Sequence, residues 1–311
     1  MDTRILCSRS LLHFLSLARC TKTLCRHSSS KRWQARQSKD IYRREAAVRG
    51  LRSRAAFKLL QIHDRYRIFK PGQTVVDLGY APGSWSQVAA DLTKPNGRVV
   101  GVDIIPAQPP KGVSTIQGNF LSPRVQAYVQ EFLRNPERGR VRAHLPSSSD
   151  RDDIQSPSEN RYIERISCDD KGYIDRQRET TALIEETGEI RDTVPTSNDS
   201  PDERTVDVVL SDMLMNTSGL AFRDHVGSMD LCSAALAFSY NVLCTGGHFV
   251  CKFYQGPEDK KFETQLKALF EKVHREKPDS SRSDSKEAYF IGLRRKHDAP
   301  RSEVFTRNGM S

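Results

Sequence analysis

Residues 75–85, VVDLGYAPGSW, carry the clearest chemical signal in the chain. An apolar run ends in Asp77, a glycine-rich turn follows, and Trp85 leads into an expected helix. A doubly wound α/β domain builds a nucleotide-type pocket from such a turn, at the carboxyl end of its first strand. Gly79 and Gly83 have no side chain, so the backbone can approach a ligand closely there. Alone, this segment predicts a pocket for a nucleoside-containing cofactor and does not select the cofactor.

The chain contains four further charged residues of interest, Lys58, Asp212, Lys252 and Glu287, which are far apart in the sequence. Asp212 and Lys252 are expected at or near the carboxyl ends of adjacent core strands, where an α/β fold gathers functional groups. Lys58 is expected on an N-terminal helix, and Glu287 at the start of a closing strand. Taken singly, each would be interpreted as a surface charge or an exposed ion pair.

The elements that would position these residues alternate between strand and helix. Strands are expected at residues 74–78, 98–102, 113–117, 205–211, 248–254 and 286–293, and helices at 40–69, 87–93, 125–133, 230–242 and 260–272. This alternation predicts an α/β domain with a Rossmann-like, mostly parallel sheet and helices on both faces. Asp103 follows the second strand, where it could accept hydrogen bonds from a ribose.

Charge is unevenly distributed along the chain, whose formal net charge is +10. Residues 135–204 contain 11 Lys and Arg against 17 Asp and Glu, so we expect one long, largely disordered acidic insertion. The domain is placed at residues 40–296, around this insertion, and a flexible tail is expected at 297–311. The basic remainder favours a polyanionic partner such as RNA. RNA contacts are expected from Arg43, Arg44, Arg49, Arg52 and Arg54, with a solvated charged face as the alternative.

Residues 1–39 hold nine Lys or Arg and a single acid, Asp2, together with many Ser and Leu. This composition is typical of a mitochondrial transit peptide, and the alternative is a disordered basic arm that touches RNA.

Seven cysteines form no CxxC pair, so we expect no metal site and a reducing compartment. No apolar run reaches the roughly 18 residues that a membrane-spanning helix needs.

Five blocks of the sequence, taken together, point to one family. They are DLGYAPGSW, QGNF, VVLSDMLMNTSG, GGHFVCKFYQG and KPDSSRSDSKEAYFIGL. In this order they resemble FtsJ-like ribose 2′-O-methyltransferases, over residues 40–134 and 205–296. The resemblance implies methyl transfer from S-adenosylmethionine to a ribose hydroxyl, with a catalytic tetrad of Lys58, Asp212, Lys252 and Glu287. These four would position the weakly nucleophilic hydroxyl, which Lys252 would orient or deprotonate. It also implies a cofactor pocket formed by Asp77, Gly79, Pro82, Gly83, Trp85, Asp103, Asn119 and Asp212.

Three residues depart from the pattern common in that family. Asn119 stands where an acid is usual, and Tyr80 and Ser84 stand where smaller residues are usual. An amide can still accept a hydrogen bond from an adenine amino group and can also donate one. We therefore expect cofactor binding with altered strength.

Together with the leader, the resemblance implies a uridine of mitochondrial large-subunit rRNA as the target, modified in the matrix within an assembling ribosomal subunit. A monomeric protein is expected. The alternatives are a tRNA or a nuclear pre-rRNA as substrate and, from another class, a non-catalytic RNA-binding factor for ribosome assembly. The leader argues against a nuclear substrate, and the complete tetrad argues against a pure binding protein.

Overall fold

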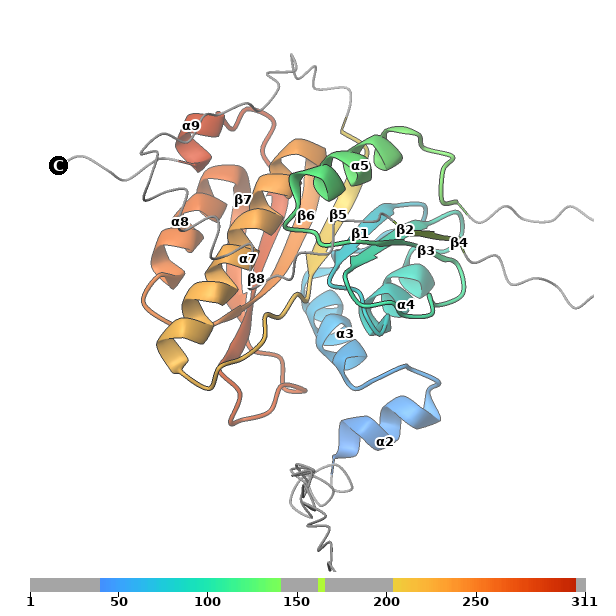
Figure 1. Ribbon diagram of the computed structural model, residues 1–311, viewed down its shortest axis with the longest axis horizontal. Helices are drawn as coiled ribbons and strands as arrows, with labels where there is room; N and C mark the ends of the chain where they lie inside the picture. The colour runs from blue at the N-terminus through green and yellow to red at the C-terminus, as the bar shows by residue number, and fades with distance from the viewer. Residues whose placement is uncertain (1–39, 141–161, 166–203, 306–311) are drawn as a thin grey trace, which may run out of the picture. The chain divides into compact units, whose positions relative to one another are not determined.

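The computed structural model describes residues 40–140, 162–165 and 204–305 (Figure 1). The expected transit peptide at 1–39 lies outside the described residues. So do residues 141–161 and 166–203 of the expected acidic insertion, and residues 306–311 of the expected tail. The expected domain boundaries therefore stay predictions.

Within the described residues, eight strands form one sheet in the order β4-β3-β2-β1-β5-β6-β8-β7. They are β1 Thr74–Leu78, β2 Arg98–Asp103, β3 Val113–Gln117, β4 Tyr162–Arg165, β5 Val206–Ser211, β6 Leu243–Tyr254, β7 Phe270–Glu276 and β8 Glu287–Arg295. Strands β1 to β6 pair in parallel, and β8 runs antiparallel to both of its neighbours, β6 and β7. The predicted mostly parallel α/β sheet is confirmed.

Helices cover both faces of this sheet (Figure 1). They are α2 Ile41–Val48, α3 Ala55–Tyr66, α4 Ser84–Leu92, α5 Pro123–Arg134, α7 Ala221–Val242, α8 Asp259–Leu269 and α9 Arg301–Val304. Successive strand residues point to opposite faces, so Val75 packs with α3 and α4, whereas Val76 packs with α5 and α7. Burial on both faces explains why the strands read as continuous apolar runs.

The expected helix at 40–69 is two helices, because the chain reverses at Gly50. This glycine has φ +66°, a conformation that strongly favours glycine. Gly50 N donates to Ala47 O at 3.3 Å and Leu51 N donates to Ala46 O at 2.8 Å, the hydrogen bonds that close a helix at a left-handed glycine. The segment from Gly50 to Arg54 therefore runs between α2 and α3, and its arginines do not share a helical face.

The C-terminal third also differs from the sequence expectation. The expected helix at 260–272 ends at Leu269, and β7 begins at Phe270, which pairs with Arg295 across the edge of the sheet. Residues 162–165 of the acidic segment form β4, parallel to β3. These strands exist through long-range pairing, which local sequence patterns do not report.

The expected flexible tail is packed as far as Phe305. Val304 on α9 is buried, and the Tyr240 hydroxyl donates to Ala299 O at 2.9 Å. The ring of Phe305 lies edge-on to Tyr240, with their centroids 5.6 Å apart. Apolar burial against α7 explains the order of residues 299–305.

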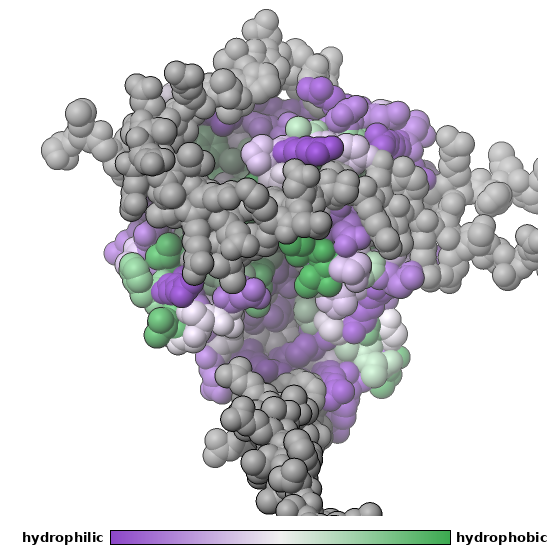
Figure 2. All heavy atoms as spheres, viewed as in Figure 1, coloured by the Kyte–Doolittle hydropathy of each residue, from purple (hydrophilic) through white to green (hydrophobic). Residues whose placement is uncertain are grey.

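Hydrophilic residues make up most of the coloured surface in Figure 2, and hydrophobic residues occur there in small separate groups. Among the described residues, no helix combines the length and the apolar character that crossing a bilayer requires.

Candidate active site at the carboxyl edge of the sheet

The carboxyl ends of β1, β5 and β6 place the predicted site residues at one edge of the sheet. Asp212 directly follows β5, and its backbone N–H donates to Leu78 O at the end of β1, at 3.1 Å. Ser211 lies opposite Cys251 in the parallel pairing of β5 with β6, so Asp212 and Lys252 are neighbours. The predicted convergence of these two residues is confirmed.

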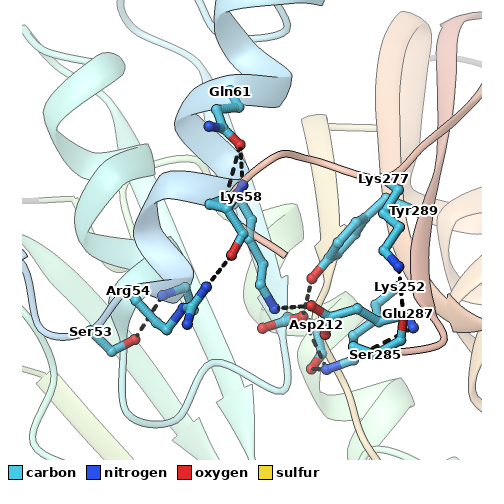
Figure 3. Close-up of polar contacts among 12 residues, drawn as sticks. Ser53, Arg54, Lys58, Gln61, Asp212, Lys252, Lys277, Ser285, Glu287 and Tyr289 are labelled. Atoms are coloured by element: carbon cyan, nitrogen blue, oxygen red, sulfur yellow. Dashed lines mark hydrogen bonds and ion pairs between the residues drawn. The ribbon is translucent and has the colours of Figure 1, made fainter. Parts of the chain in front are cut away.

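The four charged residues form two ion pairs (Figure 3). Lys252 Nζ lies 3.0 Å from Asp212 Oδ1 and donates to Asp212 O at 2.6 Å. Lys58 Nζ lies 2.7 Å from Glu287 Oε1. All four side chains are at most 21% exposed, so water screens them only in part. Two ammonium and two carboxylate groups therefore form a mostly buried cluster whose charges balance.

Tyr289 connects the two ion pairs and was missed in the sequence analysis. Its hydroxyl donates to Asp212 Oδ1 at 3.3 Å, and Lys58 Nζ lies 5.9 Å from the centre of its ring. Complete burial raises the pKa of Tyr289 well above its usual value, and the nearby Asp212 and Glu287 carboxylates act in the same direction. The hydroxyl is thus a permanent donor to Asp212. Period-two alternation from Glu287 could have indicated that Tyr289 shares its face.

Lys58 lies on helix α3 and Glu287 begins strand β8, and the segments that carry these two residues contact each other. Gln61 on α3 accepts through Oε1 from the backbone N–H of Ser280, at 3.0 Å, and from its hydroxyl, at 2.9 Å. Ser280 belongs to the β7–β8 loop, which leads into Glu287. The Ser285 hydroxyl accepts from Glu287 N at 3.2 Å. The contacts between helix α3 and this loop therefore fix the positions of Lys58 and Glu287 relative to each other.

Trp85 has a different place from the one expected. It is 2% exposed, packs against Tyr289 with ring centroids 5.5 Å apart, and donates through Nε1 to Ala55 O at 2.9 Å. We expected Trp85 to shape the cofactor loop, but its ring turns away into the apolar layer between α3 and the sheet. Its contacts position the helix that carries Lys58.

The glycine turn after β1 is close-packed against the protein itself. Gly79 has φ +77°, and a Cβ added there would lie 2.8 Å from Met213 Cα. Gly83 has φ +101°, and an added Cβ would lie 2.9 Å from Pro110 Cγ. Both glycines are therefore required by backbone conformation and by contacts within the chain. Pro82 lies between them in the same turn, next to the start of α4.

Asp103 is the last residue of β2 and Asn119 lies two residues after the neighbouring strand β3, as expected. Asp103 accepts from Ala81 N at 2.9 Å through Oδ2 and from Ile105 N at 2.8 Å through Oδ1. Asn119 Oδ1 accepts from Leu121 N at 3.0 Å. A carboxylate offers roughly four lone-pair sites, so Asp103 can order its loop and still accept from a ligand.

Asp77 lies beneath the turn and is completely buried. Its Oδ2 accepts from the Ser86 hydroxyl at 2.6 Å, whereas its Oδ1 has no hydrogen-bond partner within the described part of the chain. Burial raises the pKa of Asp77 to about 7, although the Ser86 hydrogen bond acts in the opposite direction. Asp77 thus holds a buried polar atom without a partner beneath the turn.

At least three of the five arginines expected to contact RNA have partners within the protein. Arg49 pairs with Glu45 at 2.5 Å, Arg52 donates to Pro82 O at 2.6 Å, and Arg54 donates to Ser280 O. The break at Gly50 is the cause, because it turns residues 52 and 54 toward the loops of the site. Arg43 and Arg44 are exposed on α2.

These features define a class of protein. A glycine turn after β1, acceptors at the ends of β2 and β3, and a paired-charge cluster beyond β5 are the parts from which α/β enzymes build a nucleotide site next to a group that positions a reactive atom. A Rossmann-like group-transfer enzyme has this arrangement.

Comparison with known proteins makes the assignment specific. The model of the FtsJ-like methyltransferase family matches residues 51–295. The mitochondrial rRNA methyltransferase 2 of Saccharomyces cerevisiae is 38% identical over 306 residues, which cover 90% of this chain and 92% of the yeast protein. The Schizosaccharomyces pombe protein of the same name is 36% identical, over 85% of this chain and 95% of its own length. Ribosomal RNA large subunit methyltransferase E of Thiobacillus denitrificans is 32% identical, over 86% of this chain and 91% of its own length.

The chain belongs to the FtsJ-like methyltransferase family. It is a methyltransferase, and the resemblance seen in the sequence is confirmed.

Proposed function

We propose that this protein transfers a methyl group from S-adenosylmethionine to the ribose 2′-hydroxyl of a uridine in mitochondrial large-subunit rRNA. The observation that carries the proposal is the pair of mostly buried ion pairs beside the glycine turn. Two relatives named as mitochondrial rRNA methyltransferases, each covered over more than nine-tenths of its length, support rRNA as the substrate and the mitochondrion as the compartment.

The hydrogen-bonding side chains beside the turn fit S-adenosylmethionine. Asp103 would accept from the ribose hydroxyls of the cofactor, and Asn119 would bond the adenine edge. Asp77 is completely buried and would support the turn from beneath, through its hydrogen bond with Ser86. Gly79, Pro82 and Gly83 would shape the pocket through their backbone. When bound, this cofactor supplies a methyl group on a positively charged sulfur, which is electrophilic.

The chain's own residues prepare the accepting hydroxyl. Lys252, held by two oxygen atoms of Asp212, orients the ribose 2′-hydroxyl at a fixed point of the edge. Lys58 and Glu287 hold the opposite side of this point, with Tyr289 between the two pairs. The hydroxyl loses its proton as its oxygen gains the methyl group. Lys252 receives that proton if its Nζ has first passed one to the Asp212 carboxylate at 3.0 Å, and otherwise it orients the hydroxyl as an ammonium group. Removal of one partner would leave an uncompensated, mostly buried charge.

RNA contacts from the exposed arginines Arg43 and Arg44 on α2 complete the proposal. Such contacts act on phosphates and position the RNA without selecting a base. Arg49 could join them if it exchanges Glu45 for a phosphate. The protein would act as a monomer in the matrix, on rRNA within an assembling large ribosomal subunit.

The test uses purified protein, tritiated S-adenosylmethionine and mitochondrial large-subunit particles that lack the modification. We expect label on an rRNA ribose, and a loss of about 100-fold or more in Lys252→Met, because the hydroxyl is no longer positioned. Calorimetric binding of S-adenosylhomocysteine should be retained in this variant. Lys260→Met is the matched control, since Lys260 is an exposed lysine on α8.

The remaining outcomes separate the alternatives. Label on tRNA but not on the particles would keep the reaction and overturn the substrate. Binding of the cofactor without transfer to any RNA would favour a non-catalytic assembly factor. That factor would also predict full rescue of growth by the Lys252 variant.

A further inference from the structure

Arg52 lies in the segment between α2 and α3, and its guanidinium reaches the loops of the predicted cofactor pocket. Arg52 Nη1 donates to Pro82 O at 2.6 Å and to Gln108 O, and Nη2 donates to Pro109 O at 2.9 Å. Pro82 belongs to the turn after β1. Gln108 and Pro109 belong to the loop after β2. One side chain therefore bonds three carbonyl groups on two loops.

These two loops have few groups with which to bond each other. Proline has no backbone N–H, and Pro82, Pro109 and Pro110 all lie where the loops meet. Their carbonyl groups can only accept, so facing loops of this composition need a donor from elsewhere. The planar guanidinium offers five N–H donors in a fixed fork and matches this need, whereas an ammonium group is a compact point charge.

The backbone of the same segment is anchored to the first turns of α4. Arg52 N donates to Gln87 Oε1 at 3.1 Å, and Gln87 Nε2 donates to Gly50 O at 2.9 Å. The hydroxyl groups of Ser53 and Ser84 lie 2.7 Å apart. The guanidinium is thus presented from a segment that is itself fixed to the helix that follows the glycine turn.

Two other contacts join the same loops on the pocket side. Asp103 accepts from Ala81 N, and the Tyr80 hydroxyl donates to Ala107 O at 2.7 Å. Asp103 is the proposed acceptor for the cofactor's ribose, so the spacing of the loops decides where its carboxylate stands. The guanidinium of Arg52 sets that spacing from the outer side.

We propose that Arg52 is a positioning residue of the methyl-donor pocket, which clamps the turn after β1 to the loop after β2. This inference rests on the proposed function, because it takes S-adenosylmethionine as the ligand. It replaces the sequence-based expectation that Arg52 contacts RNA. A preformed pocket binds its ligand without the cost of ordering two loops.

Two substitutions distinguish a clamp from an RNA contact. Arg52→Lys keeps the positive charge that a phosphate contact needs but lacks the fork that spans three carbonyl groups. Arg52→Gln removes both. Arg124→Gln, on the exposed side of α5, is the matched control. Each variant is prepared as the full chain, and circular dichroism and thermal unfolding verify that it is folded.

The dissociation constant of S-adenosylhomocysteine is measured by calorimetry, and KM for S-adenosylmethionine and for RNA, with kcat, by methyl transfer. Both Arg52 variants should weaken donor binding and raise donor KM by ~10-fold or more, as expected for lost charge-assisted hydrogen bonds. In Arg52→Lys, kcat at saturating donor and KM for RNA should stay within about threefold of wild type, because the contacts described above join Arg52 to the two loops and to α4 and not to the ion pairs. Arg124→Gln should match wild type.

Unchanged donor affinity in Arg52→Lys would overturn the inference. So would a pattern in which only Arg52→Gln fails and only the RNA KM rises. Failure of the wild-type protein to bind S-adenosylhomocysteine, or to transfer methyl to any RNA, would instead contradict the proposed function. If Arg52→Gln does not fold, the comparison of Arg52→Lys with wild type still decides the question.

Discussion

At the scale of single residues, the site depends on charges placed where water is scarce. Lys252 and Asp212 compensate each other, whereas Asp77 has no ionic partner within the described residues and is completely buried. Desolvation therefore raises the pKa of Asp77 to about 7. The unfolded chain would release this proton near pH 4. The native state consequently holds a proton that the unfolded state has lost between these two pH values.

The sign of the resulting pH dependence follows from linkage. The native state binds more protons, so the contribution of Asp77 to the free energy of unfolding falls as pH rises from about 4 to 7 and is constant above that. Asp77→Asn cannot titrate, so its stability relative to wild type should increase over this range, by at most about 4 kcal/mol for a shift of roughly three units. Urea unfolding without ligand at pH 5 and pH 8 measures the change. Asp91→Asn, at an exposed acid, serves as control, and equal pH responses of Asp77→Asn and wild type would contradict the prediction.

At the scale of elements, the turn after β1 fits its neighbour strand through one large side chain. Tyr80 is 5% exposed and lies over Gly101 of β2. A Cβ added at Gly101 would lie 2.7 Å from Tyr80 Cγ. The bulky Tyr80, which departs from the family's smaller residue, is therefore accommodated by a strand position without a side chain.

A double-mutant cycle tests this fit. Gly101→Ala should destabilise the protein by about 1–3 kcal/mol, because the added methyl group overpacks the site. In a Tyr80→Ala background the same substitution should cost about 1 kcal/mol less, whereas Tyr80→Phe keeps the ring and should give no relief. Chemical unfolding of the six proteins gives the coupling energy. A coupling near zero in the Tyr80→Ala background would contradict a clash with the ring and would assign it to Tyr80 Cβ, which alanine keeps and which lies 2.9 Å from the added atom.

At the scale of the whole molecule, the acidic segment lies between α5 and β5, and both of its flanks are hydrogen-bonded to the domain. Arg140 donates to Asn96 O at 2.6 Å, and Thr205 donates through its hydroxyl to Leu133 O at 2.9 Å. Arg98, two residues after Asn96, also donates to Leu133 O, at 3.1 Å. The domain therefore fixes the chain on either side of the segment.

A shortened chain tests whether the domain needs the segment. Residues 141–203 are replaced by a flexible Gly/Ser linker of about 20 residues, whose end-to-end distance of roughly 25 Å spans several strands of the sheet. All proposed site residues lie outside the deleted range, so the affinity for S-adenosylhomocysteine should stay within about threefold of wild type. Calorimetry measures the affinity, and thermal unfolding reports the cost of removing β4 from the edge beside β3. A folded protein that no longer binds the ligand would assign the segment a role in the pocket.

The sequence by itself determined the class of fold and the identity of the charged cluster. Apolar runs and turn residues report local burial and backbone preference, so β1, β2, β3 and β5 could be predicted to within a residue or so. Lys58, Asp212, Lys252 and Glu287 could be named because each lies in a recognisable block. Because β5 and β6 are adjacent parallel strands, Asp212 and Lys252 near their carboxyl ends had to lie close together.

Tertiary structure decided which partner each side chain has. Arg52 and Arg54 read as basic surface residues, but a left-handed glycine at position 50 redirects them toward carbonyl groups of distant loops. Trp85 reads as part of a ligand loop and is instead buried against Tyr289. Strand β7 was missed because it exists through its pairing with β8. Local patterns record whether a residue is buried, whereas the contact that buries it depends on segments far away in the chain.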